Sequence, residues 1–158
     1  MPHSWSERWV TRCRESRADT SSSETCAIQF EKIRCPMYAV SGWADGSYVS
    51  AVGEAMRDLT VPRKALIGPW GHRFPYLGMP GPAIGFLQES LRWFDQWMRG
   101  KDTGITREPA LVAWMPQAAP AKNFYAESPG RWIAEQAWPG SRIKPKRLYL
   151  NGGGQLGE

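Results

Sequence analysis

The sequence predicts an α/β fold in which helices connect the strands of a parallel sheet. Residues 35–42 form a short, continuously apolar run, which is typical of a strand buried on both faces of such a sheet. A second apolar run covers residues 63–70, and a stretch with helical spacing lies between the two. The 158-residue chain is 42% apolar and 22% charged, which is the composition of an ordinary globular protein.

The first segment, residues 1–27, differs in composition from the rest. It is rich in Ser, Thr, Arg and Glu and has few large apolar residues. Such a stretch cannot bury enough apolar surface to offset the entropy lost on ordering. We therefore expect a disordered or irregular lead-in, followed by the main domain over residues 28–142.

The first strand and helix of the main domain follow in order. The apolar run 35–42 ends at Gly42, and the pair Asp45-Gly46 marks a turn. A helix is expected from Ser47 until the segment 60–62, which ends in proline. Four apolar residues lie on one stripe of this helix: Val49, Val52, Met56 and Leu59.

The second half of the domain repeats the alternation of strand and helix. Residues 63–70 predict a buried strand, and residues 73–82 are rich in Pro and Gly and predict a loop. A long helix with a broad apolar face is expected over residues 83–99, with Gly100 as its stop, and a third strand over residues 109–115. The order of elements implies a parallel sheet with right-handed crossovers.

The C-terminal part follows a different pattern. Residues 116–143 are dominated by Pro, Ala and Trp, and no element is assigned to them. Residues 146–151 alternate polar and apolar side chains, as in a half-solvated antiparallel strand, and a polar tail follows. We therefore expect a second, all-β module to begin near residue 143 and to be cut short at residue 158.

Two polar residues follow the first two predicted strands, where catalytic groups of open α/β sheets gather. These residues are Asp45 and His72. An aspartate can hold one ring nitrogen of a histidine while the other nitrogen takes a proton from a serine. In α/β-hydrolases the acid precedes the base along the chain, as it does here.

Plainer interpretations of both residues stay open at this point. Asp before Gly is common in ordinary turns, and a lone histidine beside Pro and Trp is often structural. Two serines lie close to Asp45 in sequence, Ser47 and Ser50. Neither lies on a sharp strand-to-helix elbow, so neither is expected to act as a nucleophile.

Two motifs resemble a known family. Gly42–Gly46 (Gly-Trp-Ala-Asp-Gly) and Gly68–His72 (Gly-Pro-Trp-Gly-His) are similar to the Gly-Trp-x-Asp-Gly and Gly-Pro-Trp-x-His signatures of the CocE/NonD hydrolases, relatives of cocaine esterase and X-Pro dipeptidyl peptidases. The resemblance runs over residues 28–158, and residues 1–27 match the family poorly. It implies a partial α/β-hydrolase fold, made of the C-terminal strands and helices of its sheet, with the start of a β jelly-roll module over residues 143–158.

The resemblance also implies roles for these residues, with Asp45 as triad acid and His72 as triad base. The sequence has no Gly-x-Ser-x-Gly elbow, so the nucleophile expected from the family is missing. We expect a fragment of a serine acyl hydrolase that is inactive alone, as a truncated or frameshifted gene would produce. The alternative is a non-enzymatic interaction domain whose nine tryptophans provide a binding surface.

Composition limits the expected partners. The net charge of +5 is scattered along the chain, which argues against a nucleic-acid footprint, and no apolar run is long enough to span a membrane. Three cysteines without metal-ligand spacing favour free thiols in the cytoplasm, and no metal or cofactor is implied. The expected partner is a small ester or amide substrate of the full-length parent, and the fragment itself is expected to self-associate.

Overall fold

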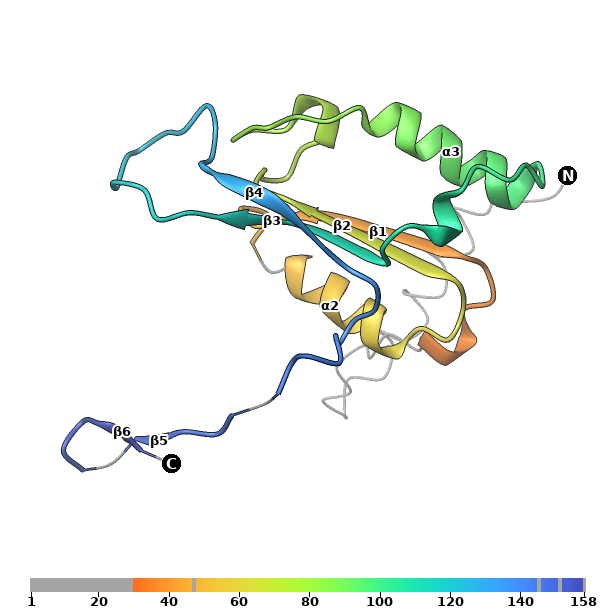
Figure 1. Cartoon of the computed structure of the whole chain (residues 1–158). Coiled ribbons are helices and arrows are strands. Elements are labelled where there is room, and N and C mark those ends of the chain that lie inside the picture. The colour runs from red at the N-terminus through yellow and green to blue at the C-terminus, as the bar shows by residue number, and fades with distance from the viewer. Residues whose placement is uncertain (1–29, 47, 145, 151, 158) are drawn as a thin grey trace, which may run out of the picture.

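The computed structural model of the chain describes residues 30–158 apart from residues 47, 145, 151 and 158 (Figure 1). The lead-in assigned to residues 1–27 lies outside the described residues. Nothing in the described part of the chain forms a helix long and apolar enough to cross a membrane.

A four-stranded sheet with the order β1-β2-β3-β4 forms the centre of the fold. Its strands are β1 (Met37–Gly42), β2 (Arg63–Gly68), β3 (Leu111–Pro116) and β4 (Gly130–Glu135). The first three strands are parallel, and β4 pairs antiparallel with β3. The predicted α/β class is therefore confirmed, and the three predicted strands are present with ends that differ by one or two residues.

Helices cover both faces of the sheet (Figure 1). Helix α2 (Tyr48–Asp58) packs on one face, and α3 (Phe86–Met98) lies over the other. The core lies between α2 and the sheet, and the predicted stripe of α2 contributes to it. Its buried members are Val52, Met56, Ala65, Ile67, Leu111 and Ala113.

The placement of the two helices corrects the expected handedness of the connections. Both crossovers, from β1 to β2 and from β2 to β3, move in the same direction across parallel strands. Because α2 and α3 lie on opposite faces, the two crossovers have opposite hands. The right-handed rule therefore holds for only one of them, although it describes nearly all such connections in other proteins.

Helix α3 presents its apolar side away from the sheet. Trp93 is the one buried residue of this helix. Four apolar side chains on its outer side are between 54% and 77% exposed: Leu87, Leu91, Phe94 and Met98. The broad apolar face expected over residues 83–99 exists, but it faces outward in the described chain.

The fourth strand was not expected from the sequence. Residues 116–143 had no assigned element, yet Gly130–Glu135 forms β4 along the whole length of β3. Its pairing register joins Leu111 with Glu135 and Pro116 with Gly130. The sheet is therefore mixed.

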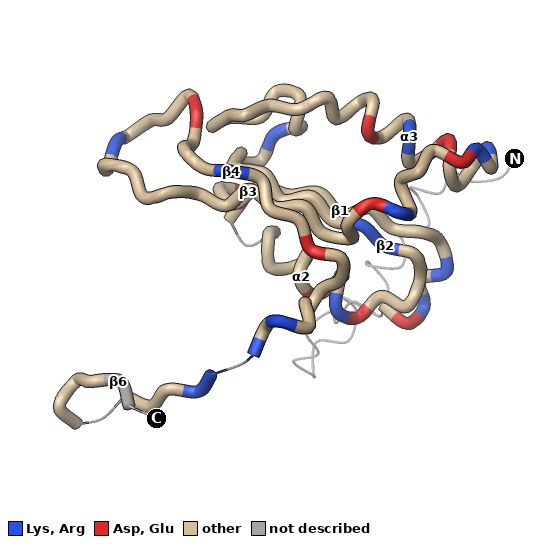
Figure 2. The backbone as a smooth tube through the Cα atoms, in the orientation of Figure 1, with Lys and Arg blue, Asp and Glu red and all other residues tan. Residues whose placement is uncertain are grey.

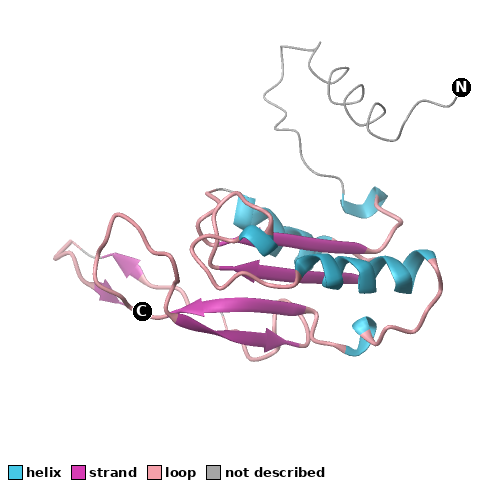
Figure 3. Ribbon diagram, turned by 90° about the horizontal axis from the view of Figure 1, so that it is seen from above, coloured by secondary structure: helices cyan, strands magenta, loops and turns pink. Residues whose placement is uncertain are grey.

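The C-terminal residues form a separate small sheet (Figure 3). Strand β5 (Tyr149–Leu150) pairs antiparallel with β6 (Leu156–Gly157). Within its described residues, the predicted strand over residues 146–151 is therefore shorter than expected, and the polar tail supplies its partner. The interpretation of this region as the start of a jelly roll stays a prediction.

Candidate active site

The pairing of β1 with β2 sets the position of the candidate site. Their register joins Gly42 with Gly68, so both strands end at the same level of the sheet. Asp45 follows Gly42 by three residues, and His72 follows Gly68 by four. Both loops therefore leave the sheet at a common rim, which is where functional groups of parallel sheets gather.

Backbone hydrogen bonds join the two loops directly. The Trp43 N–H donates to the Gly68 carbonyl oxygen at 2.9 Å, and the Ala44 N–H donates to the Trp70 carbonyl oxygen at 3.2 Å. The Asp45 N–H donates to the Gly42 carbonyl oxygen at 3.0 Å and closes a tight turn. Gly46 continues the turn with a φ of 62°, a left-handed value that glycine adopts without steric cost.

Within this turn the Asp45 carboxylate contacts the His72 imidazole. Asp45 Oδ1 and His72 Nδ1 are 2.7 Å apart. A carboxylate can only accept, so Nδ1 carries the proton in this bond, and Nε2 is left as the acceptor of a neutral ring. The Asp45 side chain is 13% exposed and the His72 side chain is 81% exposed. The structure thus brings the two predicted site residues together, with Nε2 on the open side.

Two residues that the sequence analysis did not select also belong to the site. The Ser41 hydroxyl donates to Asp45 Oδ2 at 3.2 Å, so each carboxylate oxygen has its own partner. The Tyr48 ring lies beside the imidazole of His72, with ring centroids 5.3 Å apart. Ser41 could have been noticed as a polar residue at the end of an otherwise apolar strand.

The indole of Trp43 ties the acid loop to the third strand. Its Nε1–H donates to the Trp114 carbonyl oxygen at 2.5 Å. This bond joins the loop after β1 to β3, across the position of β2 in the sheet. Trp43 in the Gly-Trp-Ala-Asp-Gly motif therefore has a structural role that its sequence position alone did not reveal.

The indole of Trp70 fills a niche made by glycines. Trp70 is 1% exposed. A Cβ built on Gly68 would come to 2.3 Å from the Trp70 ring, and one built on Gly78 would come to 2.7 Å from it. Only glycine leaves room for the ring at these positions, so the Gly-Pro-Trp motif packs the ring beneath the histidine loop.

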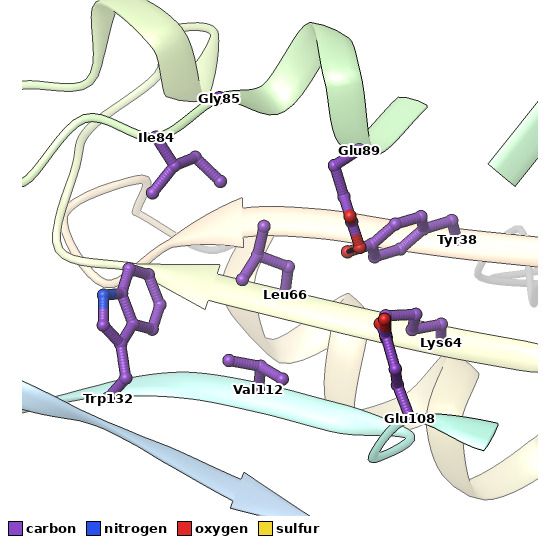
Figure 4. A pocket seen from close by; sticks show the side chains of 9 residues that line it. All are labelled: Tyr38, Lys64, Leu66, Ile84, Gly85, Glu89, Glu108, Val112 and Trp132. Atoms are coloured by element: carbon purple, nitrogen blue, oxygen red, sulfur yellow. Dashed lines mark hydrogen bonds and ion pairs between the residues drawn. The ribbon is translucent and has the colours of Figure 1, made fainter. Parts of the chain in front are cut away.

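A second polar cluster lies between α3 and the sheet (Figure 4). The Tyr38 hydroxyl donates to Glu89 Oε1 at 3.1 Å, and Lys64 Nζ donates to Glu108 Oε2 at 2.7 Å. Arg92 joins the two halves by bonding to both Glu89 and Glu108. Four members of the cluster, all except Arg92, line one end of a cavity of about 300 Å³, whose other end is apolar (Figure 4). Neither Asp45 nor His72 lines this cavity.

Burial and charge in this cluster shift two pKa values. Burial, helped by the neighbouring Glu89 carboxylate, raises the pKa of the Tyr38 hydroxyl. For Glu108, burial is the largest single influence and acts upward, but the hydrogen bonds from Arg92 and Lys64 together outweigh it. The pKa of Glu108 therefore lies below its ordinary value, and the cluster holds α3 to the sheet with charged and polar contacts.

Positively and negatively charged residues are interspersed along the described chain, and neither kind forms one continuous run (Figure 2). Among the residues that the structure describes, no group of three or more His, Cys, Asp or Glu side chains could hold a metal ion. The chemistry that this site can offer is proton transfer at His72, oriented by Asp45.

Known proteins resemble the chain in sequence and in fold. A sequence model of the X-Pro dipeptidyl-peptidase family (S15 family) matches residues 2–73, which include both Asp45 and His72. A protein named "Putative serine esterase" from Mycobacterium bovis is 30% identical over 126 residues, covering 76% of this chain, and one from Mycobacterium tuberculosis matches equally. The solved structure of a CocE/NonD family hydrolase from Staphylococcus aureus superposes with a TM-score of 0.62 at 14% identity, over 80% of this chain.

The chain is therefore CocE/NonD-like. Residues 2–73 are similar in sequence to the S15 family, and the chain shares the α/β fold of a CocE/NonD family hydrolase. It spans 18% of the length of the two mycobacterial proteins and 21% of the solved chain. The family match begins at residue 2, so the expectation that residues 1–27 match the family poorly was wrong.

Proposed function

We propose that this CocE/NonD-like chain supplies the acid and the base of a Ser–His–Asp acyl hydrolase. The observation that carries the proposal is the 2.7 Å contact between His72 Nδ1 and Asp45 Oδ1, at the shared rim of β1 and β2. In such a triad the aspartate fixes the tautomer of the histidine and stabilises the imidazolium that forms during the reaction.

In the proposed reaction, His72 Nε2 takes the proton of a serine hydroxyl as its oxygen attacks an ester or amide carbonyl. The proton then passes to the leaving group, and the acyl group stays on the serine. His72 then takes a proton from a water molecule whose oxygen attacks the acyl carbon, and returns this proton to the serine oxygen as the acyl–serine bond breaks and the acid is released. The 81% exposure of the His72 side chain is consistent with a nucleophile approaching from outside the described residues.

The nucleophile is the part that this sequence does not supply in its usual form, because it contains no Gly-x-Ser-x-Gly. The proposal therefore places the serine in polypeptide other than this chain. On its own, the chain is expected to hydrolyse a p-nitrophenyl ester no faster than buffer. Hydrolysis above that background that disappears in His72→Ala would contradict the proposed inactivity.

A chimera tests the proposed roles directly. The segment of the Mycobacterium tuberculosis protein that matches this chain is replaced with the corresponding residues of this chain, and ester hydrolysis is measured. We expect activity in the folded chimera, a loss of at least about a thousandfold in His72→Ala, and a smaller but large loss in Asp45→Asn. The matched control is Ser141→Ala, an exposed position far from the site in sequence. A folded chimera that is equally active with and without His72 would refute the assignment.

The alternative is a non-enzymatic interaction domain, and the feature that supports it is the exposed apolar side of α3 and not the tryptophans. Of the tryptophans in the described part of the chain, Trp43 alone is exposed, so these rings mostly pack inside. The exposed apolar side of α3 is the surface that favours a binding role. If His72→Ala leaves the chimera's activity intact while changes on α3 abolish an association, this alternative is the better description.

A further inference from the structure

Ser41 is an unusual residue for its place in the fold. Among the described residues, only Ser41 and Lys64 are buried polar residues, and Ser41 is 6% exposed. It lies next to the end of β1, a strand that otherwise carries mostly apolar side chains. A buried hydroxyl requires a hydrogen-bond partner, and here the partner is Asp45 Oδ2 at 3.2 Å.

The two oxygens of the Asp45 carboxylate have different hydrogen-bond donors. Oδ2 accepts from Ser41, and Oδ1 accepts from His72. The bond between Cβ and Cγ of an aspartate has a broad torsional preference, so a single contact leaves the carboxylate plane free to turn. A second donor on the other oxygen fixes that plane. Ser41 is suited to this task because its short side chain projects from β1, whose backbone is paired with β2 at this residue.

We propose that Ser41 is a positioning residue for the acid–base pair, acting through Asp45. This inference rests on the proposed function, because it assigns Ser41 a part in preparing His72 for proton transfer. By holding the carboxylate plane, Ser41 keeps Oδ1 directed at Nδ1 and so keeps the proton on that nitrogen. Nε2 then stays free to accept a proton from a nucleophile.

The test measures the tautomer of His72, which does not require a catalytically complete enzyme. The whole chain is labelled with ¹⁵N-histidine and studied by two-bond ¹H–¹⁵N correlation at alkaline pH, where the ring is neutral. The chain has two histidines, so a His3→Gln variant assigns the signals. We expect the Nδ1–H form to dominate at His72 in the parent chain.

Two variants of nearly equal side-chain shape distinguish an effect of the hydroxyl group from an effect of side-chain packing. Ser41→Val removes the hydroxyl, whereas Ser41→Thr keeps it on a side chain of the same size. We expect the share of the Nδ1–H form to fall at least about twofold in Ser41→Val and to stay near the parent value in Ser41→Thr. Ser41→Ala provides the same comparison if the branched side chains disturb the strand, and Ser141→Ala is the exposed control. Thermal melts show that each compared variant is folded.

The outcomes distinguish this inference from the proposed function. If Ser41→Val and Ser41→Ala keep the parent tautomer, the role of Ser41 is refuted and the Asp45–His72 pair is unaffected. If the parent itself shows no preference for Nδ1–H, the acid–base pair is refuted together with the role of Ser41. A fall in Ser41→Val that Ser41→Thr does not restore would mean that packing, and not the hydroxyl, holds the carboxylate.

Discussion

The carbonyl oxygen of Trp70 lies against the α-carbon of Gly42. A Cβ built on Gly42 would come to 1.8 Å from that oxygen and to 2.5 Å from the Trp70 ring. This close approach of two backbones lets the Ala44 N–H donate to the same oxygen at 3.2 Å. The acid loop and the base loop are thus held together by a contact in which one partner has to be glycine.

Replacing this glycine is therefore expected to damage both the fold and the site. In Gly42→Ala the new methyl group overlaps backbone atoms that cannot move aside, so we expect a loss of more than about 3 kcal/mol in the free energy of unfolding. Urea unfolding followed by tryptophan fluorescence measures this loss. Gly152→Ala is the matched control, because a Cβ there meets nothing within 4 Å, and a change within about 0.5 kcal/mol is expected. Equal stabilities of the two variants would contradict the contact.

The same pair of loops shows what could be predicted from sequence. The end of the first strand at Gly42 is marked by local residue types, the predicted end of the second lies two residues beyond Gly68, and parallel strands bring such ends to one rim. The proximity of Asp45 and His72 therefore followed from the chain order. The partners that support them did not, because the contacts of Ser41 and Trp43 depend on side-chain directions that no sequence pattern encodes.

Two features of the fold that the sequence did not reveal also have physical causes. Strand β4 is an edge strand whose side chains are mostly partly exposed, so it lacks the apolar run that identified β1 and β2, and it exists through its pairing with β3. For α3, the spacing of the apolar residues indicated that the helix has an apolar face, but not whether this face points toward the sheet or away from it. The polar cluster around Arg92 turns the other side of the helix toward the sheet.

Two methionines at opposite extremes of exposure test the location of the core. Met56 of α2 is 1% exposed, and Met98 of α3 is 77% exposed. We expect Met56→Ala to lower the free energy of unfolding by about 2–5 kcal/mol, because a cavity remains in the core. At protein concentrations where the chain is monomeric, Met98→Ala should change it by no more than about 0.5 kcal/mol. Urea titrations of the two variants under these conditions check this contrast, and a cost at residue 98 as large as that at residue 56 would contradict the location of the core.

Tyr38 is expected to make the protein sensitive to alkali. Burial raises the pKa of its hydroxyl in the folded state, whereas the unfolded chain ionises near pH 10. Above pH 10 the unfolded state therefore binds fewer protons at this residue than the native state, and stability falls by about 1.4 kcal/mol per pH unit. Below pH 10 both states are neutral at Tyr38, and its ionisation contributes nothing.

Thermal melts from about pH 9 to about pH 11.5 measure this effect. We expect the melting temperature of the parent to fall more steeply with pH than that of Tyr38→Phe, which cannot ionise at this position. Glu89→Gln should keep part of the steep fall, because burial, the largest single cause of the raised pKa, remains in this variant. Identical slopes for the parent and Tyr38→Phe would show that the ring is more hydrated than the structure indicates.

The exposed side of α3 predicts that the chain associates with a second copy of itself. Leu87, Leu91, Phe94 and Met98 follow one another at spacings of four, three and four residues, which is the seam spacing of paired helices. A helix with such a stripe is complementary to an antiparallel copy, in which the helix dipoles also oppose each other favourably. Sedimentation velocity of the whole chain should therefore show a species that grows with concentration.

Charge placed on the stripe should reverse this association. Two lysines, introduced as Leu91→Lys and Phe94→Lys, would face the same lysines of the second copy and would lose the apolar contact, so the variant should sediment as a monomer. Leu148→Lys, at a 45% exposed position outside α3, is the matched control and should associate like the parent. If the parent is a monomer at every concentration, α3 does not self-pair. If the Leu148→Lys control also becomes monomeric, the loss of association is not specific to α3, and the proposed contact through α3 is contradicted.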